Sequence, residues 1–252
     1  MELSEKVIII TGAARGLGQT YARRFAELGN RIVVCDQRDC AQTVAQCQEA
    51  GAQAIGFETD VTDAASAKAM AERALEQFGR IDVLINNAAL FGSLNFAPFD
   101  KLDEAQWDAT MNVNVKGIWH CCRAVVPAMR EAGGGAIINI SSLAAIYGMP
   151  NGLHYTTSKA AVIGLTRGLA REIGRYNIRV NAVAPNVVDT EAAGEFFGDK
   201  KDKLMEATTS QMSLRQAVSA DDLFGTMVYL AGEQSARTTG QTIMVDGGTV
   251  FL

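Results

Sequence analysis

The sequence predicts an α/β fold in which a doubly wound parallel sheet of about seven strands carries helices on both faces. Short apolar runs rich in β-branched residues alternate with longer helical stretches along the whole chain, a pattern typical of right-handed βαβ units. Glycine occurs 24 times in 252 residues and proline only 4 times. This balance indicates repeated tight turns between strands and helices rather than a low-complexity segment.

The expected strands are short apolar runs bounded by turn residues. Val7–Ile10 contains no polar residue, as expected for a strand that is buried on both faces of a parallel sheet. The same reasoning places the other strands at residues 31–36, 53–58, 83–86, 136–140, 179–184 and 242–245.

Helices are expected between these strands, and several end at a glycine, which is a common helix stop. Their predicted ranges are residues 16–28, 40–50, 64–77, 103–130, 155–176 and 220–230. Residues 186–214 show no strand pattern and are interpreted as a substrate-binding lid, because long loops in small domains are usually functional. With no linker or change of composition, residues 1–252 are expected to form one domain.

Composition excludes several classes of function. With 23 basic and 28 acidic residues, the net charge is −5, so the basic surface of a nucleic-acid-binding protein is missing. The N-terminus does not resemble a secretory signal, and no apolar run reaches the roughly 18 residues needed to cross a bilayer. We therefore expect no nucleic-acid or membrane partner and a cytoplasmic location.

Cysteine and histidine usage argues against metal and triad chemistry. The five cysteines lack C-x-x-C spacing, so neither a disulfide framework nor a zinc site is expected. Only two histidines are present, and no G-x-S-x-G motif accompanies them, which disfavours a Ser-His-Asp hydrolase. No metal site is expected.

A glycine-rich turn follows the first strand directly. Gly12, Gly16 and Gly18 have G-x-x-x-G-x-G spacing and open a predicted helix. Gly12 allows a tight turn, Gly16 lets backbone approach a pyrophosphate, and Gly18 lets the helix pack close to the sheet. The amino end of the helix attracts phosphate, so the sequence predicts a dinucleotide site.

Asp36 indicates which dinucleotide is bound. It ends the second strand, 20 residues after Gly16, where a carboxylate can accept hydrogen bonds from the adenosine ribose. A 2′-phosphate would be repelled, although Arg15 and Arg38 lie nearby and could partly offset that repulsion. NAD is therefore predicted as the cofactor, with NADP the less favoured alternative.

A second group of residues carries acid–base chemistry. Tyr155 and Lys159 are four residues apart, which places them on one face of a helix, one turn apart. None of the other tyrosines has a lysine at this spacing. Ser142 lies 13 residues before Tyr155, just after the fifth strand.

With these motifs, the chain resembles the short-chain dehydrogenase/reductase family, which has a Rossmann-like fold. The resemblance extends over essentially the whole chain, and the motifs that carry it are the glycine turn, Asp60-Val61, Asn86-Asn87-Ala88, Asn114, Ser142, Tyr155, Lys159, residues 181–185 and Thr190. The chain departs from the family at Ala89 and Asn186, where glycine is usual. Asn tolerates a positive φ better than most residues, so the change at Asn186 need not disturb the turn.

The resemblance implies a catalytic function for four residues. Tyr155 would be the general acid in ketone reduction and the base in alcohol oxidation. A free phenol titrates near ~10, and the Lys159 ammonium together with the nicotinamide charge would lower that pKa. Lys159 would also bind the nicotinamide ribose, Ser142 would position the substrate oxygen, and Asn114 would hold a water that connects Lys159 to solvent.

The resemblance also implies the cofactor contacts and the assembly. Asp60 and Val61 would frame the adenine, and Pro185, Val188 and Thr190 would lie by the nicotinamide amide. The remaining expected cofactor residues are Gly12, Arg15, Gly16, Leu17, Gly18, Asp36, Asn86, Asn87, Ala88, Ala89, Tyr155 and Lys159. Family members assemble as homotetramers, and the apolar C-terminal tail of this chain suits such contacts.

The expected substrate side is apolar. Ser142, Leu143, Tyr147, Tyr155 and Phe196 are the predicted substrate-binding residues, and the wider set of candidates is Phe91, Leu94, Met149, Leu153, Phe197, Met205 and Met212. No cluster of basic residues there indicates a carboxylate or phosphate clamp. We therefore expect a secondary alcohol or ketone with an apolar or aromatic body.

The predicted function is an NAD-dependent oxidoreductase that interconverts a secondary alcohol and its ketone. Overall similarity favours catabolic alcohol dehydrogenases such as those acting on 1-phenylethanol, with sugar or polyol dehydrogenases left open. A 3-oxoacyl-thioester (acyl-carrier-protein) reductase is the alternative within the family, but Asp36 argues against it because that pathway draws on NADPH. A non-catalytic dinucleotide-binding sensor is the alternative from another class, and the retained Ser142, Tyr155 and Lys159 argue against it.

Overall fold

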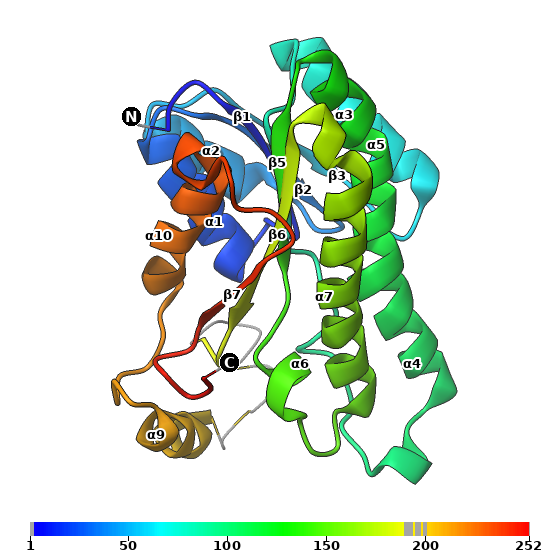
Figure 1. Ribbon diagram of the computed structural model, residues 1–252, viewed down its shortest axis with the longest axis vertical. Helices are drawn as coiled ribbons and strands as arrows, with labels where there is room; N and C mark the ends of the chain where they lie inside the picture. The colour runs from blue at the N-terminus through cyan, green and yellow to red at the C-terminus, as the bar shows by residue number, and fades with distance from the viewer. Residues whose placement is uncertain (1–2, 189–193, 195–197, 199–200, 252) are drawn as a thin grey trace.

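A seven-stranded parallel sheet runs through the centre of the computed structural model, which describes residues 3–188, 194, 198 and 201–251 (Figure 1). The predicted fold class is therefore confirmed. The strand order is β3-β2-β1-β4-β5-β6-β7. The strands are β1 (Val7–Thr11), β2 (Arg31–Asp36), β3 (Ala54–Glu58), β4 (Val83–Asn86), β5 (Gly135–Ile140), β6 (Ile178–Pro185) and β7 (Thr242–Val245).

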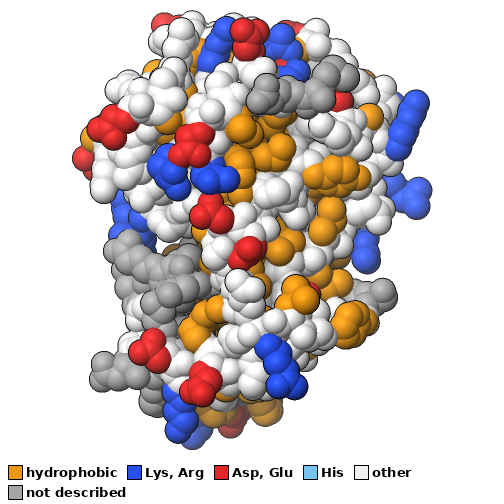
Figure 2. Space-filling view, turned by 90° about the vertical axis from the view of Figure 1, so that its left-hand side faces the viewer, with side chains coloured by type: hydrophobic (Ala, Val, Ile, Leu, Met, Phe, Trp, Pro, Cys, Tyr) orange, Lys and Arg blue, Asp and Glu red, His pale blue; other side chains and the backbone are white. Residues whose placement is uncertain are grey.

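Helices cover both faces of this sheet (Figure 1). The helices α1 (Gly16–Glu27), α2 (Ala41–Glu49) and α10 (Ala220–Ala231) lie on one face. The opposite face carries α3 (Ala64–Phe78), α5 (Gly117–Glu131) and α7 (Leu153–Ile173). Figure 2, which views the side where α10 lies, shows hydrophobic side chains in a band along the surface. No helix within the described ranges is long and apolar enough to cross a membrane.

Alternate residues of the strands contribute their side chains to two hydrophobic cores, one on each face of the sheet. In β1, Ile8 and Ile10 face one core, whereas Val7 and Ile9 face the other, as the two-residue period of a strand requires. This explains why buried parallel strands appear in the sequence as unbroken apolar runs.

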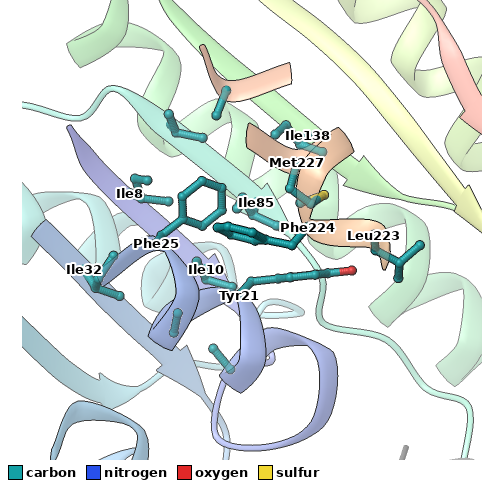
Figure 3. Close-up of a cluster of buried hydrophobic side chains, with 14 of the residues drawn as sticks. Ile8, Ile10, Tyr21, Phe25, Ile32, Ile85, Ile138, Leu223, Phe224 and Met227 are labelled. Carbon is teal, nitrogen blue, oxygen red and sulfur yellow. The ribbon is translucent and has the colours of Figure 1, made fainter. Parts of the chain in front are cut away.

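Aromatic side chains join α1 to α10 within the core that contains Ile8 and Ile10 (Figure 3). The rings of Phe25 and Phe224 meet edge to face, with their centroids 4.9 Å apart. Tyr21 lies beside them and is fully buried. Burying each such ring stabilises the fold by about 1.5–3 kcal/mol, so this contact holds the last helix against the first βα unit.

Three features of the helices differ from the sequence prediction. The helix expected over residues 103–130 consists of α4 (Glu104–Met111), a π-helical turn (Asn112–Lys116) and α5. A short helix, α6 (Ala144–Tyr147), was not predicted, and the final turn of the expected helix 155–176 is a separate 3-10 turn (Gly174–Tyr176). Within the segment interpreted as a lid, the described residues contain α9 (Lys201–Gln211) and an isolated bridge between Val188 and Val218.

The order of the strands decides where a ligand can lie. β1 pairs with β2 on one side and with β4 on the other, so the connections after β1 and β4 lead away in opposite directions. In open α/β sheets, ligands bind in the crevice at the carboxyl ends of the strands at such a switch point.

Candidate active site

A cavity of about 410 Å³ lies at the carboxyl ends of the strands, where the connections after β1 and β4 separate. It brings together most of the residues that the sequence predicted for cofactor, substrate and catalysis. These are Gly12, Arg15, Gly16, Leu17, Asp36, Val61, Asn87, Ala88, Ala89, Ser142, Leu143, Tyr147, Tyr155, Lys159, Pro185 and Val188.

Four predicted cofactor or catalytic residues within the described part of the chain are not part of the cavity wall. They are Gly18, which packs against Gly12; Asn114, which bonds Leu90; Asp60, which accepts from Thr62; and the buried Asn86, which donates to Asn139 Oδ1 at 2.9 Å. Thr190 and Phe196 lie outside the described residues, as does the further substrate candidate Phe197.

The glycine turn after β1 has the backbone conformation that its glycine spacing predicts. Gly12 and Gly16 have φ values of +63° and +60°, in the left-handed region that favours glycine. A Cβ atom at Gly12 would lie 2.7 Å from the Cα of Ala88, whereas one at Gly16 would meet nothing within 4 Å. Gly12 therefore lets the ends of β1 and β4 approach, and Gly16 leaves bare backbone facing open space.

The amino end of α1 is left open toward the cavity. Arg15 at its N-cap makes no side-chain cap, and the first turn of α1 contains no acidic residue. In contrast, Asp63 caps α3, and Ser219 and Asp222 form a capping box on α10. Because uncapped N–H groups and the helix dipole favour an anion, the start of α1 suits the pyrophosphate of a dinucleotide.

Gly18 and Asn87 support this turn from behind. A Cβ atom at Gly18 would overlap the carbonyl oxygen of Gly12 and lie 2.6 Å from Asn87 Nδ2. Asn87 Nδ2 donates hydrogen bonds to the carbonyl oxygens of Thr11, at 3.0 Å, and Gly12, at 2.9 Å. The amide of Asn87 thus fixes the glycine turn to the end of β4.

Asp36 presents its carboxylate at the β2 end of the cavity. One oxygen accepts a hydrogen bond from Ala14 N at 3.0 Å, and the other accepts one from Arg38 N at 3.0 Å. A carboxylate oxygen can accept more than one hydrogen bond, so Asp36 retains capacity for ribose hydroxyls. Arg15 and Arg38 line the same cavity, so a cationic surface also borders this end.

Asp60 shapes the loop that carries Val61. Its Oδ1 accepts hydrogen bonds from Thr62 N at 2.8 Å and Thr62 Oγ1 at 2.7 Å. Burial raises the pKa of Asp60, but hydrogen bonds from Thr62 and Gln37 outweigh that effect, so the pKa is lower than usual. The side chain of Val61 lines the cavity, while that of Asp60 is committed to the turn.

Tyr155 and Ser142 meet at the substrate end of the cavity. Ser142 follows β5, and its Oγ accepts a hydrogen bond from Ala144 N at 3.2 Å, at the start of α6. Burial raises the pKa of Tyr155 to about 12, against the opposing effect of a hydrogen bond with Ser142. The phenol is thus protonated at neutral pH and lies within reach of a second hydroxyl.

Lys159 lies one helical turn further along α7 and is buried. Its Nζ donates a hydrogen bond to the carbonyl oxygen of Ile140 at 2.8 Å and lies 5.7 Å from the centroid of the Tyr155 ring. Burial lowers the pKa of Lys159 to about 8. At pH 7 the group remains mainly cationic and close to the phenol.

Asn114 is fully buried on the π-helical turn. Its side-chain amide bonds the backbone of Leu90 and the hydroxyl of Ser158. Both amide hydrogens therefore have acceptors within the protein. The predicted function of Asn114 in holding a water stays a prediction.

Uncharged side chains surround Tyr155 on the substrate side. Leu143, Tyr147 and Met149 line the cavity there. The ring of Phe91 packs against the Tyr155 ring, with a centroid separation of 5.0 Å and an angle of 46° between the planes. Such walls favour a substrate with an apolar or aromatic body.

Several other substrate candidates do not line the cavity. Met212 is only 2% exposed and packs in the core beside α10, in contact with Gly247. Leu94 is buried below the loop surface, while Leu153 is partly exposed at the start of α7. Met205 on α9 does not line the cavity either.

Some cavity residues were missed because they were not in a recognised motif. Gln37 follows β2, Thr59 follows β3, and the carbonyl of Ile140 at the end of β5 binds Lys159. Their position immediately at the carboxyl ends of strands is the signal that would have identified them.

Asn186 differs from its expected function. It does not have a positive φ, so the turn after Pro185 does not use the conformational tolerance of asparagine. Instead, Asn186 Nδ2 donates to Thr249 Oγ1 at 2.8 Å, and Asn186 Oδ1 accepts from Val187 N at 2.7 Å. The side chain links the rim of the cavity to the C-terminal segment.

The chain is similar to known proteins over nearly its full length. A family model described as "Enoyl-(Acyl carrier protein) reductase" matches residues 12–250. A 3-oxoacyl-(acyl-carrier-protein) reductase of Thermotoga maritima is 35% identical over 100% of both chains. Subunit BbsD of a hydroxy(phenyl)methyl-succinyl-CoA dehydrogenase from Thauera aromatica is 36% identical over 98% of both.

A solved structure has the same fold. Carveol dehydrogenase from Mycobacterium avium, crystallised in complex with NAD, superposes with a TM-score of 0.91. The two chains are 28% identical, and the match covers 98% of each.

Proposed function

The chain belongs to the short-chain dehydrogenase/reductase family of oxidoreductases, and we propose that it interconverts a secondary alcohol and its ketone with NAD as cofactor. One observation carries this proposal. Ser142, Tyr155 and Lys159 lie in the same cavity as the uncapped glycine turn and Asp36, so a dinucleotide that extends from Asp36 would end beside the acid–base group.

Tyr155 supplies the proton in the proposed reaction. In ketone reduction its hydroxyl donates a proton to the carbonyl oxygen, and in alcohol oxidation the phenolate takes the proton back. A nicotinamide cofactor, when bound, would supply or accept the hydride. Ser142, which lines the same cavity as Tyr155, would hold the substrate oxygen within reach of the phenol.

Lys159 would stabilise the phenolate form of Tyr155. Burial is the main cause that raises the pKa of Tyr155 to about 12, which is too high for a base at neutral pH. A cation near the ring opposes that effect, and the Lys159 ammonium, 5.7 Å from the ring centroid, is placed to do so. Its hydrogen bond to Ile140 O keeps the ammonium in this position.

The carboxylate of Asp36 supports NAD as the cofactor. Its oxygens accept hydrogen bonds from two backbone N–H groups, which orient them toward the β2 end of the cavity. A ribose hydroxyl can donate to such an oxygen, whereas a phosphate cannot. The NAD complex of the related carveol dehydrogenase also supports NAD, while Arg15 and Arg38 are the residues that would favour NADP.

The proposed substrate has an apolar or aromatic body next to the carbinol carbon. Phe91, Leu143, Tyr147 and Met149 provide the wall. Lys159, which is held by Ile140 O, is a cation 5.7 Å from the Tyr155 ring centroid. The name of the Thauera aromatica relative includes a hydroxy(phenyl)methyl group, which agrees with this wall. The segment 186–214 would act as a lid over the same space.

Reduction of a 3-oxoacyl thioester is the second candidate. A 3-oxoacyl-(acyl-carrier-protein) reductase is 35% identical to this chain from end to end. This reaction would use the same three residues, Ser142, Tyr155 and Lys159, on a different carbonyl substrate. The two candidates are therefore distinguished by the preferred cofactor and by whether the substrate is attached to an acyl carrier.

We also propose a homotetramer in the cytoplasm. β7 is an edge strand of the sheet, and the nearby Leu214 and Phe251 are 76% and 80% exposed. Large apolar side chains that are this exposed are typical of surfaces that bind a partner. The cysteines are buried free thiols, which suits a reducing compartment.

The deciding experiment compares initial rates with NAD and NADP over secondary alcohols, ketones and a 3-oxoacyl thioester. The wild type is expected to oxidise aryl alcohols with NAD, and Tyr155→Phe should lower kcat by roughly 10²- to 10⁴-fold while cofactor affinity is retained. A preference for NADPH and the thioester would select the second candidate. Tight cofactor binding without any turnover would favour a non-catalytic sensor.

A further inference from the structure

A chain of buried hydrogen bonds connects the substrate-side loop to the catalytic helix. Asn114 Oδ1 accepts from Leu90 N at 2.8 Å, and Asn114 Nδ2 donates to Leu90 O at 3.3 Å. The same amide nitrogen donates to Ser158 Oγ at 3.0 Å. One side chain therefore binds both backbone groups of Leu90 and the hydroxyl of a residue on α7.

Ser158 completes the connection to Tyr155. Its hydroxyl is fully buried and donates to the carbonyl oxygen of Tyr155 at 2.8 Å. It therefore accepts from Asn114 and donates within the same helical turn that carries Tyr155 and Lys159. Because no group in this chain of bonds is charged, the linkage does not depend on pH in the neutral range.

The loop and the helix also meet inside the cavity. Phe91, the residue after Leu90, packs its ring against the ring of Tyr155 at a centroid distance of 5.0 Å. Leu90 and Phe91 both line the cavity. The loop is thus held to α7 by hydrogen bonds behind the wall and by a ring contact on its inner surface.

From this arrangement we propose that Ser158 is a positioning residue, which sets the distance between Tyr155 and the wall formed by Leu90 and Phe91. Ser158 does not line the cavity, so it acts through Asn114 and the Tyr155 backbone. The inference rests on the proposed function, because the width between Phe91 and Tyr155 matters where a bulky alcohol must reach the phenol. It makes Ser158 a determinant of substrate size.

Removal of the hydroxyl has a specific consequence. Ser158→Ala deprives Asn114 Nδ2 of one buried acceptor while leaving the two bonds to Leu90 in place. A buried donor without a partner is unfavourable, so the Asn114 amide is expected to shift. The Leu90 backbone would then be held less firmly, and Phe91 would sample more positions relative to Tyr155.

The matched control is Thr157→Ala. Thr157 is the neighbour of Ser158 on α7, does not line the cavity, and makes no side-chain hydrogen bond within the described part of the chain. Both variants remove a hydroxyl from the same helical turn, so a difference between them reports the linkage rather than a general effect on α7.

The first readout is amide hydrogen exchange of residues 88–93, which needs no turnover. In Ser158→Ala, exchange at Leu90 is expected to accelerate roughly threefold to tenfold, as for the loss of one hydrogen bond, with no change in Thr157→Ala. Unchanged exchange in Ser158→Ala, or equal acceleration in both variants, would overturn the inference. Because this measurement is independent of activity, it decides on the linkage even if the alcohol panel refutes the proposed function.

The second readout is discrimination between a bulky aryl alcohol and 2-propanol. Ser158→Ala should lower the ratio of their kcat/KM values by about threefold or more, mainly through the KM of the aryl alcohol, with NAD affinity unchanged. If Ser158 acts through Phe91, Ser158→Ala and Phe91→Leu should not combine additively. If Ser158→Ala leaves the ratio of the kcat/KM values constant and only lowers the melting temperature, Ser158 has a structural function alone, which would contradict the proposal.

Discussion

Lys159 Nζ lies 5.7 Å from the centroid of the Tyr155 ring, and burial shifts the pKa values of these two groups in opposite directions. The pKa of Lys159 falls to about 8, while that of Tyr155 rises to about 12. Both shifts favour the neutral form, because a buried charge loses its hydration. The site therefore holds a cation and a potential anion in surroundings that favour neither charge.

The first prediction concerns stability and pH. Between about pH 8 and the usual lysine pKa near 10.5, the unfolded chain keeps a proton on Lys159 that the folded chain has lost. The free energy of unfolding should therefore rise with pH in this window, by at most about 1.4 kcal/mol per pH unit for one group. Tyr155 acts in the opposite direction between about pH 10 and 12, where the folded state retains the proton.

Lys159→Met isolates this contribution, because methionine has no charge to lose. Urea unfolding of both proteins from pH 7.5 to 10 should show the wild type gaining stability relative to the variant as pH rises. The variant also loses the hydrogen bond to Ile140 O. This loss changes the difference in free energy of unfolding by the same amount at every pH and does not change its slope against pH. Parallel curves across this range would contradict the lowered pKa of Lys159.

The second prediction concerns cofactor choice. Asp36→Asn keeps an oxygen that can accept one of the backbone N–H groups, from Ala14 or Arg38, but it removes the negative charge. The ratio of kcat/KM for NADP to that for NAD should rise by about tenfold or more, equivalent to about 1.4 kcal/mol. Arg15 and Arg38, which line the same cavity, would then face the 2′-phosphate without the opposing carboxylate.

Asp39→Asn is the control for this change. Asp39 is close in sequence, but its carboxylate accepts from Ala41 N and does not line the main cavity. Its substitution alters the net charge equally and should leave the ratio unchanged. A similar shift in both variants would mean that overall charge, rather than the position of Asp36, sets the preference.

Much of this architecture could be predicted because parallel strands that are buried on both faces leave a direct signal. The apolar runs around Val7 and Val83 correspond to β1 and β4, and Gly12 and Asn87, which directly follow these strands, were expected at the site. α6 has only four residues, too few to show a helical period. The π-helical turn at Asn114 depends on its contact with Leu90, which no local pattern reveals.

The substrate side was predicted less well for a related reason. Apolar residues in the segments between strands and helices can pack into a core or line a cavity, and their sequence looks the same in both cases. Met212 packs against Gly247 in the core, whereas Met149 lines the cavity. The hydroxyl of Ser158 was overlooked because its importance lies in its acceptor and donor partners, which come from other parts of the chain or from the helix backbone.

The third prediction concerns the packing beneath the glycine turn. A Cβ atom in Gly18→Ala would overlap Gly12 O and lie 2.6 Å from Asn87 Nδ2. Backbone must move to relieve this overlap, so we expect a loss of about 1–3 kcal/mol in the free energy of unfolding. NAD affinity, measured by calorimetry, should fall as well, because the moved turn is the one that would bind the pyrophosphate.

Gly225→Ala provides the comparison. Gly225 lies in α10, and an added Cβ there meets nothing within 4 Å. Alanine should stabilise this helix by about 0.5–1 kcal/mol without any effect on NAD affinity. If Gly18→Ala bound NAD as tightly as the wild type, close packing at Gly18 would not be a condition for cofactor binding.

The fourth prediction tests the proposed homotetramer through two exposed side chains near β7. Leu214 and Phe251 are 76% and 80% exposed, so changing them to serine in an isolated chain should alter stability by less than about 0.5 kcal/mol. In an assembly, the same side chains are buried against another copy, and each is worth about 1.5–3 kcal/mol. The double variant Leu214→Ser/Phe251→Ser should therefore shift the sedimentation equilibrium toward smaller species. Phe99→Ser, at 78% exposure in the 3-10 turn Phe99–Lys101 before α4, should not. Equal masses for the wild type and the double variant over a wide concentration range would show that this surface does not join subunits.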